Sequence, residues 1–348
     1  MRFGLILPGV LLLVLTACQS TPAFVHSSYT SVPDWPSVPS QWRMGDVTGV
    51  SVDSNDRIWV LQRPGTLPPE LASMAAPPVM VFDTEGNFIK AWGGPGSGYK
   101  WPTNEHGVHV DDDGFVWVTG NACPDLSPAF AGRPSDDQVL KFTGEGEFVL
   151  QIGRAGQNTG TTDTVNLHRA ADADVNVTSN EVYVADGYGN RRVIVFDATT
   201  GAFKRQWGYN GGEPGDRNPC ISTFDTEFRD DQFSIVHSLR VADDGAVYVA
   251  DRENSRLQAF TPEGELTGEF TGNGGMIAGL TLAGQNQRIL VASEEERGIL
   301  FLDRATLTLL NEFSTLDLEG PNHLIAVDSQ GNIYRASLFG GIVKLKAE

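Results

Sequence analysis

The stretch VHSLRVADDGAVYVADRENSRLQAF, residues 236–260, decides the fold. Two short apolar runs flank an Asp-Asp-Gly turn, the pattern of a β-hairpin, and a third apolar run follows a polar loop. This pattern accounts for nearly every residue except His237, which stands at the head of the first run, eight residues before the turn glycine. A hairpin alone gives no reason for a histidine there.

The same unit recurs six times along the chain. Each copy reads as strand, polar turn, strand, short loop and third strand, and most copies end with a fourth strand such as FIKAWG, FVLQIG or FKRQWG. Units of four strands and about 40 to 50 residues are the size of a β-propeller blade. The sequence therefore predicts an all-β protein, a six-bladed β-propeller with four-stranded antiparallel blades over residues 44–348. The copies are GVSVDSNDRIWVLQR, HGVHVDDDGFVWVTG, DADVNVTSNEVYVADGYGNRRVIVFD, HSLRVADDGAVYVADRENSRLQAF, GLTLAGQNQRILVASEEERGILFLD and HLIAVDSQGNIYRASLFGGIVKL.

The N-terminus predicts an exported, lipid-anchored protein. MRFGLILPGVLLLVLTACQS contains one arginine, an apolar run too short to span a bilayer comfortably, and small residues that end at a cysteine. LTAC at residues 15–18 resembles a bacterial lipobox, which implies a signal peptide at residues 1–17 and a lipid on Cys18. The alternative is an ordinary signal peptide with a chance cysteine. The expected location is the periplasmic side of the outer membrane, or the cell surface.

Residues 18–43, rich in Ser and Pro, are interpreted as a tether, part of which closes the fold. The sixth copy ends at Glu348 after only three strands, so its blade lacks an outer strand. We expect the tether, around Val32 to Trp42, to supply that strand.

The charge of the chain argues against nucleic acid as a partner. Asp and Glu number 44 against 25 Lys and Arg, a net charge of −19 that repels phosphate backbones. Contact with a membrane is expected only through the lipid anchor. The expected ligand is a small molecule or a peptide.

Histidines recur at one position in alternate copies. In copies two, four and six, a histidine is followed by seven residues, a glycine, two residues and an aromatic. The three sets are His106 with Gly114 and Trp117, His237 with Gly245 and Tyr248, and His323 with Gly331 and Tyr334. At the same place, copies one, three and five carry Thr48, Ala171 or Asp172, and Ala278 or Gly279.

This alternation predicts a metal site. Alternate blades of a six-bladed ring are related by about 120°, so equivalent positions on the innermost strands converge on the central channel. Three neutral imidazoles with an open fourth position are the ligand set of a catalytic zinc site. A single histidine could instead be buried and satisfied by backbone, but three in register favour zinc on His106, His237 and His323. His109 and His168 fall outside this register and are interpreted either as structural or as supporting the residues that hold the metal.

Three polar residues follow second strands on the face where the histidines are expected. They are Arg63, Tyr188 and Arg252, and none is the short apolar filler that a blade needs. Each taken singly could be structural, the arginines in salt bridges and the tyrosine in packing. Together they are candidates for acid/base and substrate-binding roles.

The longest insertions join strands on that same face, at residues 64–77, 121–137 and 209–231. Loops gathered on one side of a repeat fold usually mark its binding side. Cys123 and Cys220 lie in two of these insertions and could pair in an oxidising compartment, although the sequence does not determine the pairing.

The segments VADGYGNRRVIVF and VADRENSRLQAF resemble the NHL repeat. With EHGVHVD and GPNHLIAVD they make the chain similar to the peptidylglycine α-amidating lyase family, over roughly residues 45–348. The resemblance implies six NHL blades and one zinc ion on three histidines. By position it implies zinc ligands at His106, His237 and His323, the catalytic tyrosine at Tyr188, the arginine beside the substrate at Arg63 and a second arginine at Arg252.

The chemistry implied by the resemblance is cleavage of the C–N bond of a peptidyl-α-hydroxyglycine, giving a peptide amide and glyoxylate. Zinc would activate the substrate hydroxyl, and Tyr188 as phenolate could take its proton. Arg63 would favour the phenolate and could bind the substrate carboxylate.

The chain departs from that family at two positions. Leu324 follows the third histidine where the family has an aspartate that binds calcium, so a structural calcium ion is in doubt. Gly189 stands where the family has a half-cystine, so that disulfide is absent.

Two other functions fit the same residues. One is a different metal-dependent propeller lyase or hydrolase acting on a small substrate, since propellers host many chemistries. The other is a non-catalytic NHL scaffold whose histidines hold a structural ion. A structural zinc site is usually closed by a fourth protein ligand, and no fourth His or Cys falls in register.

Overall fold

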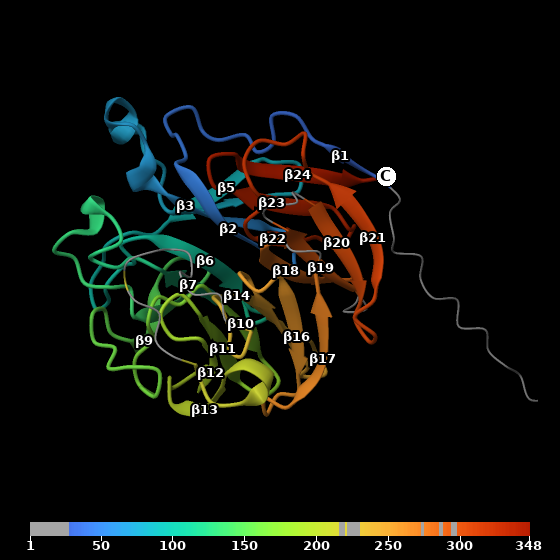
Figure 1. Cartoon of the computed structure of the whole chain (residues 1–348). Helices are drawn as coiled ribbons and strands as arrows, with labels where there is room; N and C mark the ends of the chain where they lie inside the picture. The colour runs from blue at the N-terminus through green and yellow to red at the C-terminus, as the bar shows by residue number, and fades with distance from the viewer. Residues whose placement is uncertain (1–27, 216–219, 221–229, 273–274, 285–287, 294–297) are drawn as a thin grey trace, which may run out of the picture.

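The computed structural model describes residues 28–215, 220, 230–272, 275–284, 288–293 and 298–348. In these residues, strands β1 to β24 form six four-stranded antiparallel sheets arranged around one axis (Figure 1). The prediction of a six-bladed β-propeller is confirmed. The predicted signal peptide at residues 1–17, Cys18 and the first part of the tether lie outside the described residues.

Each sheet is one blade, and the blades are numbered 1 to 6 in chain order. Blade 1 contains β2 (Asp46–Val52), β3 (Ile58–Arg63), β4 (Val79–Phe82) and β5 (Phe88–Trp92). Blade 2 contains β6 (Glu105–Val110), β7 (Val116–Gly120), β8 (Gln138–Phe142) and β9 (Phe148–Gly153). Blade 3 contains β10 (Asp172–Asn176), β11 (Glu181–Asp186), β12 (Arg192–Asp197) and β13 (Phe203–Trp207).

Blades 4 to 6 repeat this order. Blade 4 contains β14 (Val236–Val241), β15 (Val247–Asp251), β16 (Arg256–Phe260) and β17 (Leu266–Thr271). Blade 5 contains β18 (Ile277–Ala283), β19 (Arg288–Ser293), β20 (Gly298–Asp303) and β21 (Leu309–Ser314). Blade 6 contains β22 (Ile325–Val327), β23 (Ile333–Ser337), β24 (Gly341–Ala347) and β1 (Tyr29–Ser31).

Apolar side chains between neighbouring blades form the core. Trp59 and Val81 of blade 1, for example, share one buried cluster with Val108 and Val118 of blade 2. Full burial of such a side chain stabilises the fold by about 1.5–3 kcal/mol. The first strands of successive blades contact one another, and β22 contacts β2, so six inner strands enclose the channel.

The N-terminal segment closes the ring at a different place from the one expected. β1 (Tyr29–Ser31) pairs antiparallel with β24, with Tyr29 opposite Ala347 and Ser31 opposite Leu345. The closing strand therefore precedes the predicted stretch from Val32 to Trp42. That stretch packs on the core shared by blades 1 and 6 instead, because Trp35 and Trp42 offer large apolar surfaces.

Glycine permits the turn in the three histidine-bearing hairpins. Gly114, Gly245 and Gly331 have φ angles of 82°, 88° and 84°, in the left-handed region that L side chains rarely adopt. Each donates its N–H to the carbonyl three residues earlier. The recurring aromatic is tied to the same turn in two hairpins, since Trp117 and Tyr334 donate to the turn aspartates of blades 2 and 6.

Helical structure in the described residues is limited to short 3₁₀ turns. These are η1 (Pro64–Thr66), η2 (Pro69–Met74), η3 (Pro128–Phe130) and η4 (Tyr209–Gly211), all within the predicted insertions. None of the helices in the described part of the chain has the length and apolarity needed to cross a bilayer.

Candidate metal centre and surrounding site

Two of the three register histidines, His106 and His237, stand on local distortions of the inner strands, and His323 lies two residues before β22. The pairing of β14 with β15 shifts between Val236 and Ser238, and the shift surrounds His237. The pairing of β6 with β7 shifts around His106 in the same way. β-Bulges of this kind redirect a side chain and are common beside functional sites. Here they turn the imidazoles into the channel.

Each histidine is oriented by the neighbouring blade that lacks one. The Nδ1 atom of His106 lies 2.7 Å from the carbonyl oxygen of Ala171, and that of His237 lies 2.5 Å from the carbonyl of Ala278. The Nδ1 atom of His323 lies 2.6 Å from the carbonyl of Thr48. Because a carbonyl only accepts, Nδ1 carries the proton and each Nε2 has a free lone pair. The positions left open in copies three and five are thus Ala171 and Ala278.

The three imidazoles converge on one point of the channel. One ligand atom from each of His106, His237 and His323 lies within 4.8 Å of the other two, and all three residues are buried. Their ring centroids are 4.8 to 4.9 Å apart. The alternation of histidines in the sequence therefore corresponds to a true spatial cluster.

The cluster is held neutral. Burial lowers the pKa of His106 and of His237 well below the ordinary value, and nearby positive charges, including Arg252, lower it further. Burial also lowers the pKa of His323 to about 3, against a backbone hydrogen bond that favours protonation. Neutral imidazole is the form that binds a metal ion.

The hydroxyl of Tyr188 meets two of the histidines. Its oxygen lies 2.9 Å from Nε2 of His106 and 3.0 Å from Nε2 of His237. Arg252 donates from Nη1 to the same oxygen at 3.1 Å. A tyrosine hydroxyl has one proton, so it can donate to only one of the two Nε2 lone pairs at a time. The Nε2 lone pairs therefore outnumber the protons available to them, and a cation bound between them would satisfy them. Three neutral nitrogen ligands suit zinc.

The Asp, Asn and Arg of the NHL-like segments position Tyr188 and Arg252. In blade 3 the buried carboxylate of Asp186 accepts from Asn190 and Arg192 at 2.9 Å each, which fixes the loop carrying Tyr188. In blade 4 Asp251 accepts from Asn254 and Arg256 in the same manner, beside Arg252. The recurring Asp, Asn and Arg thus hold the loops on the histidine face.

Arg63 reaches the edge of the same site. Its Nε donates to the carbonyl of Glu105 at 2.8 Å, and its Nη2 lies 3.5 Å from Oδ1 of Asn121. Burial lowers the pKa of Arg63, and the nearby Tyr188 opposes that shift. Arg63 and Arg252 both act electrostatically on His323, so all six predicted site residues occupy one region.

Sequence reasoning missed Arg169. Its side chain is fully buried, and its guanidinium carbon lies 5.5 Å from the ring centre of Tyr188, the same distance as that of Arg252. Two cations therefore flank one aromatic ring, an attractive arrangement with its π electrons. Arg169 lies in a loop before β10 and outside the repeat register, so no periodic signal marks it.

His109 and His168 do not join the cluster. Nε2 of His109 lies 2.9 Å from Asp174, and Nδ1 of His168 lies 2.9 Å from Asp137. Both histidines hold buried carboxylates.

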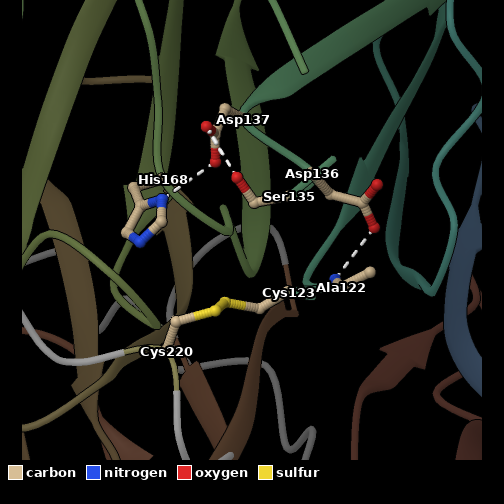
Figure 2. The surroundings of a disulfide bond; sticks show 7 residues. All are labelled: Ala122, Cys123, Ser135, Asp136, Asp137, His168 and Cys220. Atoms are coloured by element: carbon tan, nitrogen blue, oxygen red, sulfur yellow. Dashed lines mark hydrogen bonds and ion pairs between the residues drawn. A yellow bond between two sulfur atoms is a disulfide. The ribbon is translucent and has the colours of Figure 1, made fainter. Parts of the chain in front are cut away.

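Cys123 and Cys220 form a disulfide beside the site, with their Cα atoms 5.9 Å apart (Figure 2). It joins two of the three insertions on the histidine face. Near it, Asp137 contacts both His168 and Ser135. The structure also explains Gly189, because a Cβ atom there would overlap the imidazole of His168. A half-cystine at residue 189 would not fit beside that ring.

Comparison with known proteins identifies relatives of both the repeat and the chain. The family model for the NHL repeat matches residues 233–260. Peptidyl-glycine alpha-amidating monooxygenase B of Xenopus laevis is 30% identical over 257 residues, 68% of this chain and 25% of that protein. NHL repeat-containing protein 3 of Mus musculus is 29% identical, over 68% of this chain and 57% of that protein.

A third relative is a Caenorhabditis elegans protein described as a probable peptidyl-alpha-hydroxyglycine alpha-amidating lyase. It is 26% identical over 63% of this chain and 56% of its own length. Among solved structures, a streptogramin B lyase matches 93% of this chain with a TM-score of 0.55 at 15% identity, a likeness of fold alone. The chain spans only a quarter of the length of the amphibian monooxygenase. The chain is a six-bladed β-propeller that carries an NHL repeat, and the relatives that it resembles include peptidylglycine α-amidating enzymes.

Proposed function

We propose that this protein is a zinc-dependent lyase that cleaves the C–N bond of a peptidyl-α-hydroxyglycine. The observation that carries the proposal is the convergence of three neutral imidazoles on one point of the channel, with the hydroxyl of Tyr188 in contact with two of them. The relative described as a probable lyase of this type supports the reaction class.

His106, His237 and His323 would hold the zinc ion through Nε2. A zinc ion there would supply Lewis acidity, which lowers the pKa of a hydroxyl bound beside it. The backbone carbonyls on Nδ1 would fix the tautomer and the orientation of each ring, as such partners do in zinc sites.

Tyr188, as the phenolate, would accept the proton of the substrate hydroxyl. As the substrate oxygen becomes a carbonyl, the C–N bond breaks. The leaving amide nitrogen takes up the proton that Tyr188 had accepted. The products are the peptide amide and glyoxylate. Negative charge on Tyr188 would be stabilised by Arg252 at 3.1 Å and by Arg169 over its ring. Arg63 would bind the substrate carboxylate.

Glyoxylate release from a hydroxyglycine-capped peptide tests the proposal. We expect release by the purified protein, loss with a chelator, and recovery when zinc is added back. Bound zinc without release of glyoxylate would exclude the proposed lyase activity. The protein would then be a different metal-dependent propeller enzyme. A protein with neither zinc nor activity would be a binding scaffold.

We further propose that the protein is exported and anchored through a lipid on Cys18, which the sequence LTAC at residues 15–18 supports. Labelled palmitate should be incorporated into the wild-type protein in a bacterial host. Equal labelling of Cys18→Ser would contradict the anchor.

A further inference from the structure

A groove of about 950 Å³ lies between blades 1 and 2 on the histidine face. Its walls come from three segments far apart in sequence: the insertion after β3, the connection from β5 to β6, and the insertion after β7. Figure 1 shows the two insertions in blue and green, projecting on the same side of the ring. The volume is near the upper end of the range, roughly 300–1,000 Å³, of pockets that enclose drug-sized ligands.

The groove lies beside the candidate metal centre, and Arg63 belongs to both. Arg63 lines its inner end, together with Glu105, whose carbonyl accepts from the Arg63 side chain. The same guanidinium interacts electrostatically with Tyr188 and with His106. A ligand whose carboxylate binds Arg63 could therefore extend from the site into the groove.

Buried polar contacts preorganise the floor. The carboxylate of Asp136 accepts from the backbone N–H groups of Thr103, Asn104 and Ala122, at 2.8 to 3.0 Å. The indole of Trp101 donates to Glu105 at 2.8 Å. The bonds from Thr103 and Asn104 to Asp136 join the β5–β6 connection to the β7–β8 insertion. A floor fixed before binding reduces the entropy lost when a ligand is ordered.

The lining is largely apolar between Arg63 and Arg133, and the carboxylate of Glu105 in it is buried and accepts from Trp101. Five prolines line the groove with the half-buried side chains of Leu126 and Phe130. Proline has no N–H to donate, so these walls favour apolar contact. Exposed Arg133 lies on the groove rim, and no carboxylate in the described residues is paired with it. In a chain of net charge −19, two arginines on one groove favour an anionic ligand.

We infer that this groove binds the peptide segment that precedes the hydroxyglycine. An apolar residue next to the hydroxyglycine packs against Phe130 and Leu126, and an acidic side chain further upstream pairs with Arg133. The inference rests on the proposed function for the position of the reacting end. It predicts that the substrate is an extended acidic peptide rather than a small acyl-hydroxyglycine.

Three substrates test it: acetyl-hydroxyglycine, acetyl-Ala-Ala-Phe-hydroxyglycine and acetyl-Glu-Ala-Phe-hydroxyglycine. In the wild type we expect kcat/KM for glyoxylate release to rise from the first to the third. Phe130→Ala should lower kcat/KM about 10-fold for both peptides and leave the short substrate within about 2-fold, since only the peptides lose apolar contact with the aromatic ring. Arg133→Ala should remove the preference for Glu, about 2- to 5-fold for one partly exposed charge pair.

Phe203→Ala and Arg154→Ala are the matched controls, because both residues are exposed and neither lines the groove. Equal kcat/KM for the three substrates, or equal losses in the controls, would overturn the inference while glyoxylate release upheld the proposed function.

If no substrate gave glyoxylate, the proposed function would fail. Peptide binding would then show whether the groove is a peptide site. The affinity of the unreactive peptide acetyl-Glu-Ala-Phe-Gly is then measured by calorimetry. Weaker binding to Phe130→Ala and Arg133→Ala than to the controls supports the peptide site. Absent binding, or binding that both variants leave unchanged, overturns it.

Discussion

The two ends of the axial channel treat histidine in opposite ways. At one end, His106, His237 and His323 rest on backbone carbonyls, and burial lowers the pKa of each. At the other end, three residues further along β6, His109 contacts Asp174 in a cavity of about 460 Å³. Burial alone would lower the pKa of His109, but Asp174 and, more weakly, Asp111 raise it above its ordinary value.

The difference teaches that the acceptor, rather than burial, decides what a channel histidine does. A carbonyl fixes the Nδ1 proton and leaves a neutral ring with a free Nε2 for a metal ion. A carboxylate stabilises the positive ring and makes it one half of an ion pair. Four predictions test this contrast.

Removal of one of the three clustered imidazoles should have the largest effect on activity. His237→Ala should lower glyoxylate release by about 10³-fold and weaken zinc binding by at least about 10-fold, because metal activation of the substrate hydroxyl is worth several kcal/mol. His109→Gln is the matched control and should retain zinc and activity within about 2-fold. Similar losses in both variants would remove the distinction between the two ends.

Removal of the Tyr188 hydroxyl should separate chemistry from metal binding. Tyr188→Phe should lower kcat by about 10²- to 10³-fold, the usual worth of a general acid/base, with zinc content unchanged. Tyr248→Phe changes a buried tyrosine of the blade 4 hairpin and should leave kcat unaltered. A Tyr188→Phe enzyme with normal kcat would exclude the tyrosine from proton transfer.

The disulfide cross-links insertions at the channel end that carries His106, His237 and His323. Its loss should therefore affect that end selectively. A Cys123→Ser, Cys220→Ser variant should lose about 2–4 kcal/mol in the free energy of unfolding by denaturant titration. Hydrogen exchange should quicken in residues 121–137 and stay unchanged in the β6 segment that carries His109. Uniform quickening around the ring would contradict a local role.

The smallest effect is a pH dependence at the other end. The folded-state pKa of His109 is raised, so the ion pair with Asp174 stabilises the fold at pH values below the unfolded pKa of about 6.5. That stability is lost as the pH rises through the folded-state value. The loss in His109→Gln should be about 2 kcal/mol at pH 5.5 and smaller at pH 9. A loss that grows with pH would contradict the assignment.

Much of this arrangement could be predicted because repeats encode it locally. The turn glycines and the alternation of His106, His237 and His323 are periodic, so the blade count, the convergence and the shared face follow from register alone. The loop residues Tyr188 and Arg252 follow fixed positions after second strands for the same reason.

The rest depends on contacts between distant segments. The closing strand at Tyr29–Ser31 was misplaced because three residues on an edge carry little pattern. Arg169 lies outside the repeat, and its position over Tyr188 follows from packing of the segment before β10 against the loop after β11. The groove floor depends on one buried carboxylate, Asp136, which joins two loops with no sequence relation to each other.

Zinc affinity of the wild type and of three single variants, His106→Ala, His237→Ala and His323→Ala, tests the central claim most directly. The account predicts one zinc ion per chain in the wild type, and a loss of affinity of at least about 10-fold that is similar in all three variants. A wild type that binds no zinc, or one variant that binds it as tightly as the wild type, would contradict a single centre shared by alternate blades.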